Sequence, residues 1–295
     1  MPVKAVKIAN HSVGPGHPCF MVAEIGINHN GDIETAFKLI DAAVAAGCQA
    51  VKFQKRTVEL VYSQADLARP RPNPFGETNG DLKRGLEFGM DEYREIDRYC
   101  REKNILWYAS CWDEESIHFI EQFDPPCHKI ASACITHVDL LQRYRATGRP
   151  IIMSTGMSTM EEVRQAVALV GFDNLILLHT VSTYPSRVDD LNLRVIHTLQ
   201  QEFPCPIGYS GHEVGLQTSV AAAALGACMI ERHLTLDRAM WGSDQAASVE
   251  PHGFARLVRD VRAVERAMGD GIKRVLAEEE PIKQKLRRTP EKKKR

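Results

Sequence analysis

Short apolar runs recur about eight times along the chain, and amphipathic stretches with the period of an α-helix separate them. The runs lie at residues 20–25, 50–53, 105–109, 128–131, 151–154, 175–180, 207–210 and 229–233. Strand followed by helix, repeated in this way, is typical of a parallel (β/α)8 TIM barrel of the α/β class, which commonly uses about 250 residues. The chain has 295 residues, 44% of them hydrophobic, and is long enough to bury such a core.

A doubly wound open sheet would also alternate strands with helices, and two observations favour the barrel over it. No GxGxxG motif follows the first apolar run, and polar residues stand at the C-terminal end of nearly every run. In a barrel these ends converge on one mouth, where catalytic groups gather. In an open sheet they would spread along an edge, with ligand bound at one switch point.

Capping signals support the division into helices. Amphipathic stretches at 33–46, 91–103 and 160–170, together with a final one at 253–268, have the helical period. Ser158 with Glu161 three residues later predicts a capping box before the 160–170 helix. Gly47 and Gly171 follow helices at positions where a left-handed C-cap is expected.

The barrel domain is expected to span residues 1–276. Within it, residues 1–16 form an N-terminal hairpin, with Val3–Gly14 as its strands, that closes the bottom of the barrel. Residues 62–89 are dense in Pro, Gly and charge, follow the second strand, and are expected to form a lid over the mouth. Residues 277–295 form a charged tail, expected to be solvated and partly disordered; an oligomer contact and RNA binding are remoter options.

Composition excludes several classes of partner. The formal net charge is −1, so the chain has no global attraction to nucleic acid or to an anionic membrane, and any anion site must be local. The N-terminal residues lack the apolar run expected of a signal peptide, and the apolar stretches are too short or too rich in alanine to be expected to span a bilayer. The eight cysteines include no CxxC pair and several lie in apolar runs, which favours reduced thiols in a cytoplasmic protein over a disulfide framework.

Two lysines stand at the ends of apolar strands. Burying a lysine costs several kcal/mol unless a counter-charge is present, so Lys52 and Lys129 predict a bound anion. Nearby hydroxyls can supply further donors, which suits a substrate with phosphate, carboxylate or both. Pairing with a buried carboxylate such as Glu24 or Glu231 is one alternative, and a Schiff-base lysine is another.

His212 and His233 lie on adjacent predicted strands at similar depth. Neutral imidazoles in that arrangement bind a divalent ion whose remaining positions are filled by water and substrate oxygens. A structural role for either histidine is the alternative interpretation.

Eight strings, in order from about Phe20 to Gly269, resemble those of the N-acetylneuraminate (sialic acid) synthase family. They are AEIGINHNGD, VKFQK, KIAS, IIMSTGMST, STYP, GYSGHE, ERHLTLDR and GSDQAASVEP. The resemblance implies a homo-oligomeric transferase that condenses phosphoenolpyruvate with an N-acetylmannosamine-like sugar aldehyde. The product would be a sialic-acid-type 3-deoxy-2-ulosonic acid, released with phosphate. The cofactor it implies is a divalent metal, manganese first, with magnesium or cobalt as alternatives.

The resemblance also implies roles for the phosphoenolpyruvate side of the site. His212 and His233 correspond to the two metal ligands, and Lys52 to the partner of the phosphoenolpyruvate carboxylate. The phosphate cradle corresponds to Ser110, Lys129, Ser132, Ser154 and Ser210, and Ser182 stands where members carry Asn or Ser.

On the acceptor side, the corresponding residues are Glu24, Gln54, Tyr184 and Asp244, with Glu24 expected to handle protons near the aldehyde. The other polar residues of the predicted mouth, Asn28, His29 and Thr155, are also expected to contact substrate. The metal is expected to polarise the aldehyde as a Lewis acid before the enol carbon attacks it.

The chain departs from the family's pattern at several places. YASCWD replaces STPFD, Gly211 replaces an Asp, and Gln245 replaces a His. Members also continue into a small antifreeze-like C-terminal domain that lends an arginine to the partner's acceptor site, and this chain is expected to lack it. The basic residues of the predicted lid are a hypothetical substitute; they are Arg69, Arg71, Lys83 and Arg84.

Two further functions stay open at this point. One is the same chemistry with another acceptor: a phosphorylated aminosugar, a diacetamido-trideoxyhexose, mannose or a pentose. The other is a non-catalytic barrel that binds sugar or phosphoenolpyruvate, although retention of both histidines and both lysines argues against it.

Overall fold

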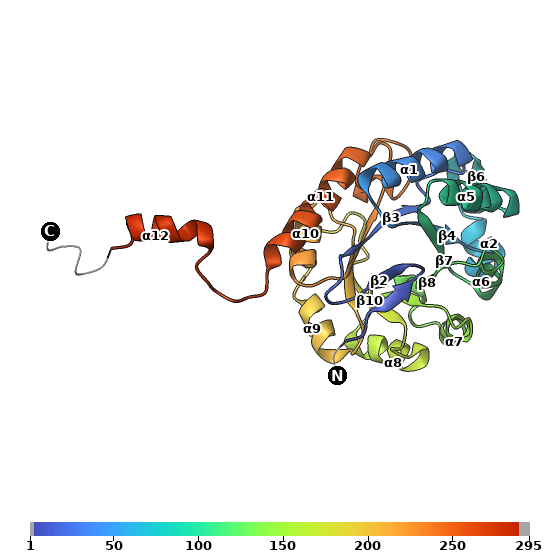
Figure 1. Ribbon diagram of the computed structural model, residues 1–295. Helices are drawn as coiled ribbons and strands as arrows, with labels where there is room; N and C mark the ends of the chain where they lie inside the picture. Colours follow the sequence, from blue (N-terminus) through green and yellow to red (C-terminus); the bar gives the residue numbers. More distant parts are fainter. Residues whose placement is uncertain (1–2, 289–295) are drawn as a thin grey trace.

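The computed structural model describes residues 3–288 and confirms the predicted fold class. Eight parallel strands form a closed barrel in which β12 pairs with β3, so the sheet has no free edge (Figure 1). The strands are β3 (Phe20–Gly26), β4 (Ala50–Lys55), β7 (Leu106–Cys111), β8 (His128–Ile130), β9 (Ile151–Ser154), β10 (Leu175–Thr180), β11 (Ile207–Gly211) and β12 (Met229–His233).

A helix follows each strand and lies on the outside of the barrel (Figure 1). These helices are α1 (Ile33–Ala46), α5 (Met90–Glu102), α6 (Glu114–Glu121), α7 (Val138–Ala146), α8 (Met160–Val170), α9 (Val195–Glu202), α10 (Gln217–Ala224) and α11 (Pro251–Met268). Short 3-10 turns interrupt some connections: η1 (Ser132–Cys134), η2 (Val188–Asp190) and η3 (Gln245–Ala247).

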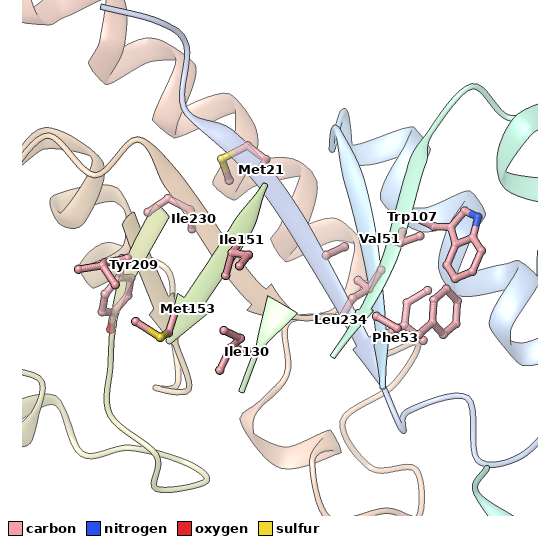
Figure 2. Close-up of a cluster of buried hydrophobic side chains, with 14 of the residues drawn as sticks. Met21, Val51, Phe53, Trp107, Ile130, Ile151, Met153, Tyr209, Ile230 and Leu234 are labelled. Carbon is pink, nitrogen blue, oxygen red and sulfur yellow. The ribbon is translucent and has the colours of Figure 1, made fainter. Parts of the chain in front are cut away.

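Two apolar cores result from the alternation of side chains along each strand. Residues that point outward, such as Met21, Val51 and Ile230, pack against the helices in one large cluster (Figure 2). Residues that point inward, such as Phe20 and Val22, fill the barrel near the N-terminal ends of the strands. The opposite, C-terminal end of the barrel is therefore the one free to hold polar groups.

The N-terminal hairpin closes the bottom of the barrel, as predicted. It consists of β1 (Val6–Ile8) and β2 (His11–Val13), paired antiparallel. Val6, Ile8 and Val13 are buried in the same cluster as the inward-facing strand residues. The hairpin thus acts as an apolar plug that excludes water from the end of the barrel opposite the mouth.

The insertion after β4 has more secondary structure than a lid-like loop would have. It contains α2 (Val58–Val61), α3 (Gln64–Leu67), the hairpin β5 (Pro70–Asn73) with β6 (Gly76–Thr78), and α4 (Asn79–Gly85). A capping box between Thr78 and Asp81 starts α4. Phe75 at the hairpin turn meets the ring of Trp241 edge-on, with centroids 6.3 Å apart, so the insertion packs against the segment after β12.

Two of the predicted helix caps need correction. The N-cap of α8 is Thr159, with Glu162 closing the box, and not Ser158 with Glu161, because Thr159 is the extended residue immediately before the helix. Gly47 has the predicted left-handed conformation, at φ 84° and ψ 28°. Gly171 shares the positive φ of 81° but has an extended ψ of 159°, so it turns the chain directly into the next loop.

After α11 the chain leaves the barrel (Figure 1). It continues through η4 (Ala277–Glu279) and α12 (Glu280–Leu286), neither of which buries a side chain. The basic end of the predicted tail, residues 289–295, lies outside the described residues. Within residues 3–288 no helix is both long and apolar enough to span a bilayer. All eight cysteines carry free thiols.

The hairpin plug makes a prediction about stability. Ile8→Ala should lower the free energy of unfolding by about 2–5 kcal/mol, because it removes a fully buried side chain from a closed apolar layer. Lys7→Ala, at the exposed neighbouring position, is the matched control and should change it by less than about 0.5 kcal/mol. Equal midpoints of chemical denaturation for the two variants would show that the hairpin does not seal the barrel.

Candidate active site

A cavity of about 220 Å³ opens at the C-terminal mouth of the barrel, and all eight strands contribute to its wall. The strand residues that line it are Glu24, Lys52, Gln54, Ser110, Lys129, Ser154, Thr180, Ser210, Glu231 and His233. Lys52 with Gln54, and Glu231 with His233, are pairs spaced by two residues, which places both members on the inner face. Ser132, Ser182, Tyr184 and His212 join from the loops directly after the strands.

Four buried charges occupy the floor of the cavity. The Nζ atom of Lys52 lies 3.0 Å from Oε2 of Glu24 and 3.1 Å from Oε1 of Glu231. The Nζ atom of Lys129 lies 3.3 Å from the same Glu231 oxygen. Both lysines therefore pair with buried carboxylates, which was the alternative to a bound anion in the sequence analysis. The same lysines also line the cavity. The two positive and two negative charges compensate one another, which makes their burial tolerable.

The charge cluster shifts the pKa values of its members in opposite directions. Burial raises the pKa of Glu24 to about 7 against the attraction of Lys52, and the neighbouring Glu231 adds to the rise. Burial would also raise the pKa of Glu231, but the attraction of Lys129 and Lys52 outweighs it and lowers the value to about 2. Burial lowers the pKa of Lys129 to about 8. The cluster can therefore gain or lose a proton close to neutral pH.

Hydroxyl groups surround the cluster. Ser110 accepts a hydrogen bond from Nζ of Lys52 at 3.2 Å, and Ser210 donates to Glu231 at 3.1 Å. Among the described residues the buried Oγ of Ser154 has no hydrogen-bond partner. Ser132 accepts from the backbone amide of Gly156 at 3.0 Å. The wall thus offers hydroxyl donors on several sides of the lysines, as a tetrahedral anion requires.

The two histidines face each other with ring centroids 5.4 Å apart. The Nδ1 atom of His212 lies 2.7 Å from the carbonyl oxygen of Val181, which makes it the donor and leaves Nε2 with a free lone pair. Burial lowers the pKa of His212 to about 3 and that of His233 to about 4, so both rings are neutral. Tyr184 packs over His212 at 4.0 Å between centroids.

Neutral imidazoles with an oriented lone pair fit a divalent cation. Within residues 3–288 no group of three or more His, Cys, Asp or Glu side chains is arranged to hold a metal ion. The pair of histidines would therefore supply only part of a coordination sphere. The remaining positions would be left to water and to substrate oxygens, which is the arrangement of a catalytic rather than a structural metal site.

A second buried ion pair lies behind the histidines, and the sequence interpretation missed it. Glu213 follows His212 and Arg232 precedes His233, and both side chains are fully buried on the outer side of the barrel. Arg232 donates from Nη1 to Glu213 at 3.0 Å and to Ser219 at 2.8 Å, and Tyr209 donates to Glu213 at 2.9 Å. The pair ties the loop that carries His212 to the strand that carries His233.

Three residues predicted to contact substrate form contacts with other groups of the protein. The amide of Asn28 donates to the carbonyl of Leu234 and to Ser248, both at 2.8 Å. His29 stacks on Phe88 at 4.0 Å between centroids and accepts from the amide of Gly31. The hydroxyl of Thr155 donates to the carbonyl of Leu178. None of the three lines the cavity, because each satisfies backbone or packing needs at the barrel rim.

Asp244 also lies outside the cavity wall, but its Oδ2 atom is 3.9 Å from Nδ1 of His233, so it borders the site. Trp112 and Met157 line the cavity and were not anticipated, since apolar residues just after strands carry no distinguishing signal in the sequence.

The glycine at position 211, where the family's pattern has an Asp, has a steric explanation in this structure. A Cβ atom there would lie 2.5 Å from Glu213 and 2.7 Å from the Tyr209 ring.

Comparison with known proteins agrees with this geometry. The NeuB family model matches residues 39–273. The chain is 42% identical over 291 residues to N-acetylneuraminate-9-phosphate synthase of Homo sapiens, covering 97% of this chain and 81% of that protein. It is 35% identical over 286 residues to N,N'-diacetyllegionaminic acid synthase of Legionella pneumophila, covering 94% and 80%. The structure of the N-acetylneuraminic acid synthetase of Leptospira borgpetersenii, solved with citrate, superposes with a TM-score of 0.84 at 32% identity, covering 97% of this chain and 99% of that one.

The position of His29 predicts a pH dependence of stability. Burial lowers its pKa from 6.5 to about 3, so its contribution is fully present above pH 6.5 and is lost as the pH falls towards 3. His29→Asn, which retains an acceptor but does not titrate, should flatten the stability curve between pH 6 and pH 4 by up to about 1.4 kcal/mol per pH unit. Urea denaturation across this range measures the slope, with His252→Asn, at an exposed position of α11, as the control. A wild-type slope in His29→Asn contradicts the assignment.

The buried pair behind the histidines predicts an asymmetry between single and double variants. Glu213→Gln leaves Arg232 buried without a counter-charge and should cost about 3–5 kcal/mol of unfolding free energy. Glu213→Gln combined with Arg232→Met should cost less, because no uncompensated charge remains. Glu95→Gln removes half of an exposed ion pair on α5 and should cost no more than about 1 kcal/mol. A double variant less stable than the single one would count against the ion pair.

Proposed function

The chain belongs to the NeuB family, and on that premise we propose that it condenses phosphoenolpyruvate with an N-acetylmannosamine-like aldose to give a sialic-acid-type 3-deoxy-2-ulosonic acid and phosphate. The observation that carries the proposal is one cavity that holds two buried lysines, a ring of hydroxyls and two neutral imidazoles side by side. The lysines and hydroxyls suit a small substrate with carboxylate and phosphate groups. The imidazoles suit a divalent cation.

Phosphoenolpyruvate has a natural place over the charge cluster. Its carboxylate would pair with Lys52, and its phosphate with Lys129 and the hydroxyls of Ser110, Ser132, Ser154 and Ser210. Each incoming negative charge competes with Glu24 and Glu231 for the lysines. Because the pKa of Glu24 is raised to about 7, this carboxyl group can take up a proton as the anion binds and so reduce the repulsion.

His212, through Nε2, and His233 would hold a divalent cation, manganese first and magnesium or cobalt as alternatives, which when bound would act as a Lewis acid towards the aldehyde carbonyl. Tyr184 packs against the rings of both histidines and shields them from solvent on one side. Gln54 donates to Glu24 at 2.9 Å and so orients that carboxyl group on the floor of the cavity, where it would face the acceptor.

The reaction needs three events that these residues can support. The enol carbon of phosphoenolpyruvate bonds to the aldehyde carbon, water adds at C2, and the C2–O bond breaks to release phosphate. Lys129 and the hydroxyls stabilise the charge that grows on the departing phosphate in a site that excludes bulk water. Glu24, with a pKa near neutrality, can move a proton to or from the acceptor.

Either a free or a phosphorylated acceptor fits this scheme. Three carbons from phosphoenolpyruvate and six from the aldose make nine, so carbon 9 of the product is carbon 6 of the acceptor. The human relative is named for a 9-phosphate, whereas the Legionella relative is named for a legionaminic acid.

The direct test incubates the protein with phosphoenolpyruvate, manganese and a panel of aldoses, and measures both phosphate and the ulosonic acid. We expect release only when both substrates are present, loss of activity with EDTA and recovery with manganese. Binding of sugar without phosphate release from any aldose would instead favour a non-catalytic barrel. Inactivation by borohydride with pyruvate, without need of metal, would favour a Schiff-base aldolase.

The proposed role of Lys129 predicts a kinetic defect. Lys129→Gln should lower kcat/KM for phosphoenolpyruvate by about 100-fold or more, because it removes a preorganised charge from the leaving phosphate. Lys38→Gln, at an exposed position on α1, makes the same change in charge away from the cavity and should leave the rate unaltered. Steady-state kinetics at saturating acceptor measure both. A loss of less than threefold in Lys129→Gln, with native circular dichroism, would remove the lysine from the mechanism.

A further inference from the structure

A second cavity, of about 530 Å³, lies between the insertion and the segment after β12. The insertion supplies Arg71 and Lys83 to its wall, and the segment after β12 supplies Trp241 and Ser243. Asn30, in the turn between β3 and α1, completes the polar part of the wall. No residue of this cavity belongs to the charge cluster or to the histidine pair.

The two cations of this cavity differ from the other basic residues nearby. Arg84 pairs with Glu59 at 2.9 Å and Arg56 pairs with Glu87 at 3.1 Å. Among residues 3–288, in contrast, no carboxylate lies within ion-pair distance of Arg71 or Lys83. Arg71 donates to the amide oxygen of Asn79 at 3.1 Å, and Nζ of Lys83 lies 4.8 Å from the ring centroid of Tyr62.

The surroundings leave these cations short of negative charge. Burial, followed by the positive charges of Arg56 and Arg71, lowers the pKa of Lys83, although Asp244 and Glu87 oppose the shift. Both carboxylates have other partners, since Glu87 pairs with Arg56 and Asp244 accepts from Ser243 at 2.7 Å. An anion between Arg71 and Lys83 would relieve the repulsion and compensate the half-buried ammonium group.

Asn30 adds an oriented acceptor to the same wall. Its amide nitrogen donates to the carbonyl of Trp241 at 2.8 Å, which fixes the side chain. Its Oδ1 atom is buried and has no hydrogen-bond partner among the described residues. A ligand with a hydroxyl group next to its anion would satisfy both the acceptor and the cations.

Asp244 connects the second cavity with the active site. On one side it lies 3.9 Å from the ring of His233, and on the other its negative charge partly opposes the lowering of the pKa of Lys83. Its neighbour Ser243 lines the second cavity. A sugar whose aldehyde lies at the histidines and whose chain extends past Asp244 therefore brings its far end towards Arg71 and Lys83.

We propose that the Arg71–Lys83 cavity is an anion subsite that binds a phosphate ester on the terminal carbon of the acceptor sugar. This inference rests on the proposed condensation and selects the phosphorylated form of the acceptor. The planar guanidinium of Arg71 can meet two phosphate oxygens, and the ammonium of Lys83 a third. The proposal also reduces the set of basic residues in the insertion that were expected to contact the acceptor. Arg71 and Lys83 line the cavity, whereas Arg84 is paired with Glu59 and does not.

The test compares N-acetylmannosamine with N-acetylmannosamine 6-phosphate by quantifying the ulosonic acid product. The wild type should favour the phosphorylated sugar in kcat/KM by about 100-fold. Lys83→Gln and Arg71→Gln should each raise KM for the phosphorylated sugar by about 10–100-fold, as expected for loss of one charge-assisted hydrogen bond, and should reduce the preference accordingly. Arg84→Gln makes the same change in charge on α4 and should keep the wild-type preference.

The possible outcomes distinguish failure of the subsite proposal from failure of the proposed condensation. Preference of the wild type for the unphosphorylated sugar, or an equal effect of Arg84→Gln, overturns the subsite while the condensation stands. If the wild type converts neither sugar, calorimetric titration with N-acetylmannosamine 6-phosphate tests the subsite by binding alone. Binding that is weakened at least tenfold in the combined Lys83→Gln and Arg71→Gln variant supports the subsite, and binding that is unaffected or absent overturns it.

Discussion

Lys52 is held between Glu24 and Glu231, and Lys129 shares Glu231 with it, in the interior of a closed barrel. Four charges from β3, β4, β8 and β12 meet there because closure of the sheet brings these strands around one axis. Burying any one of them alone would cost several kcal/mol, whereas the set of four is electrically balanced. This balance is the constraint on which the site depends, because an anion that enters competes with Glu24 and Glu231 for the lysines, and Glu24 can reduce that competition by taking up a proton from solvent.

The alternation of side chains along a strand lets one segment serve both the site and the scaffold. In β12, Glu231 and His233 face the cavity, while Arg232 between them faces α10 and binds Glu213. The same two-residue period places apolar residues of other strands against the helices and leaves the plug of β1 and β2 to seal the far end. Positions next to the histidines are therefore fixed by packing and by a buried ion pair, and the cavity side chains inherit that rigidity.

The strands and helices that show clear hydrophobic periodicity were predicted well from the sequence. The bounds of β9, β10, β12 and α1 agree with the expected ranges, because hydrophobic periodicity is a local property. The cap of α8 was shifted by one residue, since Ser158 and Thr159 are each followed by a glutamate three positions later. The short helices of the insertion were not predicted, because elements of four to seven residues depend on tertiary contacts for their stability.

The direction of a side chain just beyond a strand has no period, and the predicted site residues that do not line the cavity lie mostly there. Glu24, inside β3, was assigned to the cavity, and the structure places it in the wall. Asn28 and His29, a few residues later, turn towards the segment after β12 and towards Phe88. The same region, together with the insertion, forms the second cavity. Strand residues thus surround the charge cluster and one histidine, whereas loops and the insertion shape the space beyond Asp244. Substitutions in that outer space could change which sugar is accepted without disturbing the balanced charges beneath it.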